Sequence, residues 1–206
     1  MTPIPYEIQV FINCPFDPQY QAMGDAITFA VFDCGFRPRM ALEVDDGGQV
    51  RIDKIFELIG NCRFGIHDIS RTESDDRTGL PRFNMPLELG MFLGAKRFGQ
   101  GRQKKKVCLI LDRERNRYQA FISDIAGQEV RAHQGEPREA IRAVRDWLRS
   151  LRPRINIPGG SEIAARYALF LAALPRMCEE LRLSRDELTY VDYAWCVSEW
   201  QITHPW

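Results

Sequence analysis

The stretch Val107-Cys-Leu-Ile-Leu111 is short, apolar and rich in branched side chains, and it predicts a buried β-strand. It is preceded by a basic segment, residues 96–106, with six Lys and Arg side chains and no acidic one. We expect this segment to be a solvated loop that leads into the strand. A buried apolar strand entered from a charged loop is typical of a sheet that is covered on both faces.

Outward from this strand, the chain alternates extended and helical patterns. Further strands are predicted at residues 8–12, 36–42, 63–67 and 129–132. Apolar residues at helical spacing predict helices at residues 20–33, 50–59, from 85 onward and 137–151. Strands separated by single helices indicate an α/β domain with a parallel sheet of about five strands and helices on both faces.

A cluster of helix breakers, Pro153-Arg-Ile-Asn-Ile-Pro-Gly-Gly160, ends this pattern. We therefore divide the chain into an α/β domain, residues 1–152, and a helical C-terminal extension, residues 161–206. Within the extension, helices are predicted at 165–181 and 186–201, the second being rich in aromatic residues. We expect Trp195 and Trp200 to pack on the α/β body, and the alternative is a dimer interface.

Composition excludes several classes of protein. The 206 residues carry 28 Lys and Arg against 28 Asp and Glu, so a globally basic nucleic-acid binder and an acidic disordered chain are both excluded. The basic stripe on the helix predicted at 137–151 is interpreted as a solvated face, and nucleic acid is not expected as a partner. The longest apolar runs fall short of the roughly 18 residues of a membrane span, and no signal peptide is visible.

The cysteines and histidines indicate no metal site. None of the six cysteines has the two-residue spacing of a zinc or redox motif, and the three histidines lie far apart. We expect free thiols, a cytoplasmic protein and no metal cofactor. His67, at a strand end, is interpreted as a core histidine.

Ligands of an open parallel sheet bind beyond the carboxyl ends of its strands. The loop after the first strand, Asn13-Cys-Pro-Phe-Asp17, lacks the glycine pattern of a dinucleotide fold and that of a P-loop. Dehydrogenase-type cofactor binding is therefore not expected. Phe11, Asn13, Pro15 and Phe16 are instead predicted to form the floor of a base pocket, although Phe11 is more simply explained by core packing.

The most informative residue is Glu88. Met85, Leu89 and Phe92 surround it at helical spacing, so its side chain is predicted to point inward. A carboxylate rarely occupies such a position without a function, because an unpaired buried charge is costly. It suits a nucleophile or a stabiliser of a cationic transition state. The alternative is a glutamate that complements the dipole of its own helix.

Other polar residues accompany Glu88 at the predicted strand ends. Asp68 directly follows a strand and is predicted to contact a sugar or to cap the turn at Ser70. The predicted substrate-binding residues of the later loops are Arg71, Arg82, Phe83 and Asn84. An arginine, an aromatic ring and an amide together can hold phosphate, stack on a base and read its edge. The alternative is a helix start with Asn84 as N-cap.

Three segments together resemble the superfamily of nucleoside 2-deoxyribosyltransferases and Toll/interleukin-receptor-like (TIR-like) proteins. They are Val10-Phe-Ile-Asn-Cys-Pro-Phe16, Cys62-Arg-Phe-Gly-Ile-His-Asp-Ile-Ser70 and Pro86-Leu-Glu-Leu-Gly-Met-Phe-Leu-Gly-Ala95. The resemblance covers about residues 7–135 and implies a flavodoxin-like or TIR-like fold. It also implies that Glu88 attacks or stabilises the anomeric carbon of an N-glycoside, that Asp68 contacts the sugar, and that residues 13–16 line the base pocket.

The approach to Glu88, Gly79-Leu-Pro-Arg-Phe-Asn-Met-Pro86, is bulkier and more basic than the transferase pattern, which favours a phosphorylated nucleotide or NAD as substrate. The leading hypothesis is an N-glycosidase or transferase that acts on a nucleotide, nucleoside or NAD, of the kind found among defence and toxin effectors. It needs no cofactor. The alternatives are a nucleotide sensor without turnover and a TIR-like assembly module, and we expect a homo-oligomer.

Overall fold

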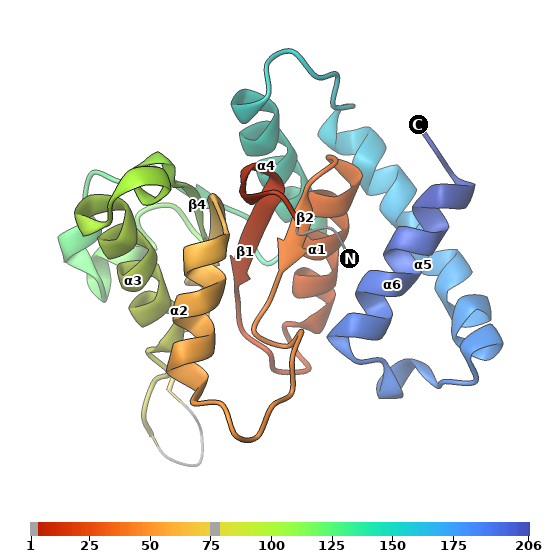
Figure 1. The fold of residues 1–206 in the computed structure, drawn as a ribbon, viewed down its shortest axis with the longest axis horizontal. Helices are drawn as coiled ribbons and strands as arrows, with labels where there is room; N and C mark the ends of the chain where they lie inside the picture. Colours follow the sequence, from red (N-terminus) through yellow and green to blue (C-terminus); the bar gives the residue numbers. More distant parts are fainter. Residues whose placement is uncertain (1–3, 75–78) are drawn as a thin grey trace.

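A computed structural model describes residues 4–74 and 79–206 of the chain. Its centre is a sheet of five parallel strands in the order β2-β1-β3-β4-β5 (Figure 1). The strands are β1 (Gln9–Asn13), β2 (Arg37–Arg39), β3 (Phe64–Asp68), β4 (Val107–Asp112) and β5 (Val130–Ala132). The order reverses next to β1, so that the loops after β1 and β3 diverge to opposite faces, where α/β proteins bind their ligands. The predicted five-stranded α/β fold of flavodoxin-like or TIR-like type is confirmed.

Helices cover both faces of the sheet. One face carries α1 (Gln21–Asp33) and α4 (Pro137–Leu151), and the other carries α2 (Arg51–Asn61) and α3 (Asn84–Phe98). The loops after β1, β2 and β3 lie along one edge of the sheet, the lower edge in Figure 1. The first turns of α1, α2 and α3 therefore meet at that edge.

Strand side chains alternate between the two faces, as the pleat requires. On β1, Val10 and Ile12 join the core under α1 and α4, while Phe11 joins the core under α2 and α3. On β4, Leu109 joins the core under α1 and α4, while Ile110 packs against α3 on the other face. Burial on both faces explains why these strands are almost continuously apolar in sequence.

The C-terminal helices α5 (Gly160–Leu181) and α6 (Tyr190–Thr203) form a further layer outside α1 and α4 (Figure 1). Phe170 and Trp200 are buried against Phe29 of α1, with ring centroids 5.4 to 5.8 Å apart. The expectation that the tail aromatics pack on the α/β body is thus confirmed for Trp200. Trp195 lies 47% exposed on the outer side of α6.

Some predicted boundaries differ from the observed ones. Strand β2 is three residues long, because Pro38 sits within the segment and the chain turns after Arg39. The last helix begins at Tyr190, where Thr189 and Asp192 form a capping box. Asn84 is the first residue of α3 and its N-cap is Phe83, so the predicted capping role of Asn84 is wrong.

The basic segment before β4 is exposed except for its last residue. Lys106 is 1% exposed, its ammonium group donates to the carbonyls of Ile59 and Cys62, and it lies 4.7 Å from the ring centroid of Phe92. The prediction that the whole segment is solvated is therefore wrong at this position. The end of α2 leaves carbonyl oxygens with room for a further donor, and the lysine supplies it.

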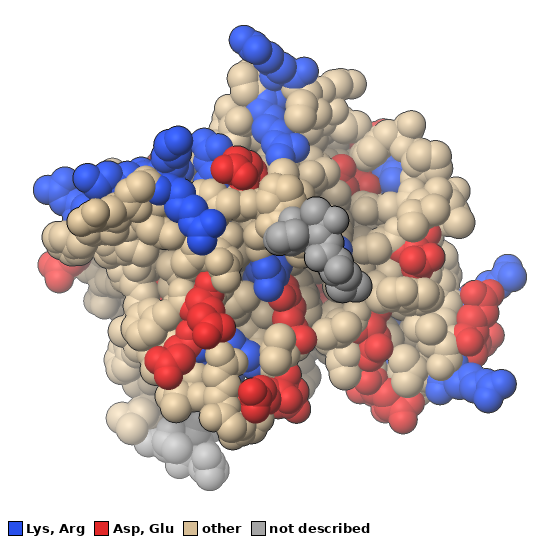
Figure 2. All heavy atoms as spheres, in the orientation of Figure 1, with Lys and Arg blue, Asp and Glu red and all other residues tan. Residues whose placement is uncertain are grey.

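Charge is unevenly distributed over the surface. In the view of Figure 2, most Lys and Arg side chains lie in the upper part and most Asp and Glu in the lower part, where the loops after the strands lie. The exposed basic residues of α3 and the turn after it are Lys96, Arg97, Arg102, Lys104 and Lys105. Over residues 4–74 and 79–206, no helix combines the length and the apolar character that a membrane crossing requires.

Candidate active site at the carboxyl edge of the sheet

A cavity of about 240 Å³ opens at the carboxyl edge, between the loops after β1 and β3 and the first turns of α2 and α3. We call it the arginine cavity. The described residues that line it are Pro15, Phe16, Asp17, Arg51, Arg71, Glu73, Ser74, Arg82, Asn84 and Met85. The volume lies just below the range of roughly 300–1,000 Å³ for typical ligand pockets, which suits a sugar phosphate better than a whole dinucleotide.

Three arginines in the lining of this cavity provide positive charge. Arg51 lies over the ring of Phe16, 5.7 Å from its centroid, and Arg71 lies 3.5 Å from the Asp17 carboxylate. Arg82 reaches the cavity from the segment before α3. Guanidinium groups bind phosphate through paired hydrogen bonds, and an exposed aromatic ring offers a stacking face for a base.

Glu88 lies one helical turn behind Asn84, about 6 Å further along the axis of α3. It is 6% exposed, which confirms that its side chain points inward. Burial raises the pKa of Glu88 to about 7, and the positive charge of Arg51 partly offsets this effect. Because Arg51 also lines the arginine cavity, it connects the buried carboxyl group with the cavity electrostatically.

Asn13 and His67 hold the start of α3 in place. Asn13 is 1% exposed, and its amide nitrogen donates to the carbonyl of Met85 at 2.9 Å and contacts His67 Nδ1 at 3.0 Å. His67 is fully buried against the rings of Phe11 and Phe92, and burial lowers its pKa to about 3. The interpretation of His67 as a core residue is confirmed, although its Nε2 atom has no hydrogen-bond partner within the described residues. The side-chain amide of Asn13 is bonded to the Met85 carbonyl in the first turn of α3. Asn13 therefore positions the helix that carries Glu88.

Asp68 points to the other face of the sheet. It is fully buried, accepts a hydrogen bond from the Ser70 N–H at 2.8 Å and lies 3.1 Å from Nε2 of His133. Burial alone would raise the pKa of Asp68, but His133 and the bond from Ser70 hold it below its ordinary value. The predicted turn-capping contact with Ser70 is confirmed. Asp68 does not line the arginine cavity, and this geometry gives it no access to a sugar bound there.

A second buried acid supports the same edge and was not recognised in the sequence. Asp112, at the end of β4, forms a 2.7 Å ion pair with Arg117. Arg117 also donates to the carbonyls of Ile69 and Ser70, so it ties the loop after β3 to the loop after β4. An aspartate at a strand end followed by arginine five residues later is too common a pattern to identify such a contact.

The structure brings together only part of the predicted binding set. The predicted residues Pro15, Phe16, Arg71, Arg82 and Asn84 line the arginine cavity. Phe83 is 64% exposed and outside the lining, and Cys14 is buried on the α1 side of the loop. Sequence analysis missed Arg51 and Asp17. The sequence marks these two residues only by their positions. Arg51 lies at the start of α2, and Asp17 lies at the end of the loop after β1.

The raised pKa of Glu88 makes a prediction about stability. The folded chain holds this proton up to about pH 7, whereas the unfolded chain releases it near the ordinary value of 4.5. Stability contributed by the protonated form is therefore lost as the pH rises from about 4.5 to 7. Glu88→Gln removes this loss, so we expect the variant to gain up to about 3 kcal/mol over the wild type at pH 8 and little at pH 4.5.

Urea unfolding of both proteins at pH 4.5 and pH 8 measures this difference. Glu179→Gln, an exposed substitution on α5, is the matched control and should leave both midpoints unchanged. An equal effect of Glu88→Gln at the two pH values would contradict the raised pKa of this buried carboxyl group.

Comparison with known proteins gives one partial similarity. None of the known protein-family models matches the chain. The chain is 32% identical over 80 residues to Protein tirC of Dictyostelium discoideum, a match that covers 34% of this chain and 39% of that protein. No solved structure matches the chain significantly. With the five-stranded parallel sheet, this similarity supports a TIR-like α/β module.

Proposed function

We propose that this chain cleaves the N-glycosidic bond of a phosphorylated nucleotide, with Glu88 as the reacting carboxylate. The observation that carries the proposal is a buried glutamate one turn behind a cavity lined by three arginines, at the ligand-binding edge of the sheet. A mononucleotide and either half of NAD present the required sugar, phosphate and base.

The chemistry follows from charge. Breaking the bond between sugar and base leaves positive charge on the anomeric carbon and the ring oxygen. Ionised Glu88 stabilises that charge or forms a covalent bond to the anomeric carbon, which water then hydrolyses with release of the sugar. A partly desolvated carboxylate interacts more strongly with this charge than one in bulk water.

The arginines account for binding. Arg51, Arg71 and Arg82 neutralise the phosphate, and the exposed ring of Phe16 supplies a surface for stacking. A negatively charged ligand beside Arg51 weakens the influence of that arginine on Glu88. The positive charge that develops on the sugar then takes the place of the Arg51 charge beside Glu88. The ionised carboxylate is therefore stabilised most in the transition state.

Incubation of the purified protein with NAD, ribonucleotides and deoxyribonucleotides tests the proposal. Chromatography should show free base with at least one of these compounds, and sugar phosphate or ADP-ribose in equal amount. Binding without base release under all conditions would contradict it and would favour the nucleotide sensor. The observation in favour of the sensor is that Glu88 is not itself part of the cavity lining.

Removal of two of the arginines should weaken the binding of nucleotides much more than the binding of nucleosides. In the Arg71→Ala, Arg82→Ala double variant, we expect affinity for a ribonucleoside 5′-monophosphate to fall about 100-fold, because two charge-assisted contacts are lost. Affinity for the matching nucleoside should change much less. Equilibrium binding at constant ionic strength measures both, with Arg154→Ala as an exposed control away from the cavity. An equal loss for both ligands would contradict the phosphate assignment.

A further inference from the structure

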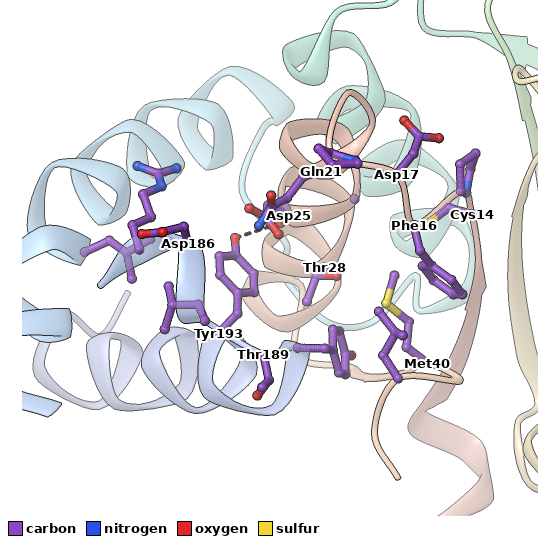
Figure 3. A pocket seen from close by; sticks show the side chains of 18 residues that line it. Cys14, Phe16, Asp17, Gln21, Asp25, Thr28, Met40, Asp186, Thr189 and Tyr193 are labelled. Atoms are coloured by element: carbon purple, nitrogen blue, oxygen red, sulfur yellow. Dashed lines mark hydrogen bonds between the residues drawn. The ribbon is translucent and has the colours of Figure 1, made fainter. Parts of the chain in front are cut away.

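A second cavity lies between the α/β body and the C-terminal helices, and it is outside the site described so far (Figure 3). We call it the tail cavity, and its volume is about 270 Å³. One wall is formed by the loop after β1, by α1 and by the segment after β2. The other is formed by α5, the turn at 185–187 and α6. The loop residues Pro15, Phe16 and Asp17 separate it from the arginine cavity, since they line both.

The tail cavity has the opposite charge from the arginine cavity. Among residues 4–74 and 79–206, Asp17, Asp25 and Asp186 line it, together with one basic residue, Arg185. Asp17 lies near Arg71. Asp25 is on the α1 wall beside the Tyr193 hydroxyl, which donates to its backbone carbonyl at 2.9 Å (Figure 3). Burial raises the pKa of the Asp25 carboxyl group to about 7, an effect that Arg185 only partly offsets.

A second, independent feature concerns Tyr190, a lining residue whose hydroxyl group has no partner within the described residues. Tyr190, at the start of α6, lines the cavity, and its hydroxyl oxygen is buried and makes no hydrogen bond within the described part of the chain. A buried hydroxyl without a partner is costly, and a bound polar group removes that cost. The lining also includes apolar side chains, among them Phe16, Met40, Leu174 and Leu188.

From these features we propose that the tail cavity binds a small organic cation, with its ammonium or guanidinium group against Asp25 and its apolar part among the aromatic and aliphatic walls. The cation supplies the positive partner that the Asp25 carboxylate lacks, and its N–H group donates a hydrogen bond to the Tyr190 hydroxyl oxygen. The rings of Phe16, Tyr190 and Tyr193 provide faces that attract a cation. The volume, below that of typical drug-sized sites, limits the ligand to a small one.

Benzylamine and its neutral isostere benzyl alcohol are the probes for the test. We expect the full chain at pH 8 to bind benzylamine at least about tenfold more tightly than benzyl alcohol, since one charge-assisted contact distinguishes them. Titration followed by two-dimensional NMR gives both affinities, and the shifting amides should include those of Asp25 and Tyr190. Equal affinities, or shifts confined to other parts of the chain, would overturn the proposal.

Two variants test the named groups. Asp25→Asn should weaken benzylamine binding about tenfold, whereas Asp45→Asn, an exposed control, should leave it unchanged. Tyr190→Phe keeps the ring and removes only the unpartnered hydroxyl, so it should fold normally and bind benzylamine several-fold more weakly. Unchanged binding in both cavity variants would overturn the assignment, and Tyr190→Phe decides the matter if Asp25→Asn fails to fold.

The pH dependence of binding adds a third readout. Between pH 8 and pH 6, benzylamine should bind about tenfold more weakly, because Asp25, with a pKa of about 7, gains a proton while the amine stays charged. The groups that face Asp25 are Cys14, Tyr167, Tyr193 and Arg185, together with the cavity acids Asp17 and Asp186. Burial raises the pKa of the thiol and of both phenols, so they remain neutral over this range. Asp25→Asn should abolish the pH dependence, and Asp186→Asn should retain it.

This proposal does not depend on the proposed glycosidase. Base release that fails while benzylamine binds would leave the tail cavity intact as a site. Base release that occurs while benzylamine does not bind would leave the proposed function intact and remove this inference.

Discussion

Glu88→Gln should lower the rate of base release by about 10²- to 10³-fold, the loss observed when a preorganised group that stabilises transition-state charge is removed. The amide is nearly isosteric with the carboxyl group but carries no negative charge and cannot act as a nucleophile. Affinity for the unreacted nucleotide should change little, because the phosphate and the base contact other residues. Steady-state rates and equilibrium binding of the variant measure the two effects separately.

The wild-type rate should also depend on pH in a defined direction. Because burial raises the pKa of Glu88 to about 7, the rate should increase from pH 6 to pH 8 as the carboxylate forms. The residual rate of Glu88→Gln should lack this increase. A wild-type rate that falls over the same range would identify the protonated form as the active one. A variant with full activity would exclude Glu88 from the chemistry.

Phe170→Ala should have the largest effect on stability. Phe170 is fully buried on α5 between Phe29, Tyr193 and Trp200, and its deletion leaves a cavity that the rigid surroundings cannot close. We expect a loss of about 3–5 kcal/mol in the free energy of unfolding, or roughly 10 °C in the melting temperature. Calorimetric or denaturant unfolding measures it.

Leu169→Ala on the same helix is the control, because Leu169 is 62% exposed and its truncation should cost less than about 0.5 kcal/mol. The larger loss should appear in one transition that includes the whole chain, since Phe170 belongs to the same hydrophobic core as the strands. Separate unfolding of the tail, with the α/β body unaffected, would show that residues 161–206 are an independent unit.

Local patterns were sufficient to predict the fold. A buried parallel strand such as β4 is nearly all apolar, and helices such as α4 have a clear apolar stripe, so both are visible in a single sequence. The length of β2 was overestimated. The strand has three residues, one of them a proline, and its length is set by pairing with β1 alone. The burial of Lys106 depends on the carbonyls that end α2, which lie more than 40 positions away.

The candidate site was harder to predict, because its geometry is set by contacts between distant segments. Glu88 was found because the apolar residues around it follow helical spacing. Arg51 has no such local signal, since its role comes from the way the first turn of α2 approaches the loop after β1. The orientation of Asp68 could not be predicted from the sequence either. Its place at a strand end suggested a role in binding, but the pleat turns it toward His133 and away from the arginine cavity.

The most direct test of the proposed chemistry is a crystal structure of Glu88→Gln with an uncleaved nucleotide bound. The account predicts phosphate between Arg51, Arg71 and Arg82, and an anomeric carbon about 3–3.5 Å from the side chain at position 88, the distance of a reactive encounter. A nucleotide bound elsewhere, or one with its sugar turned away from α3 and residue 88 still sealed from it, would contradict the account.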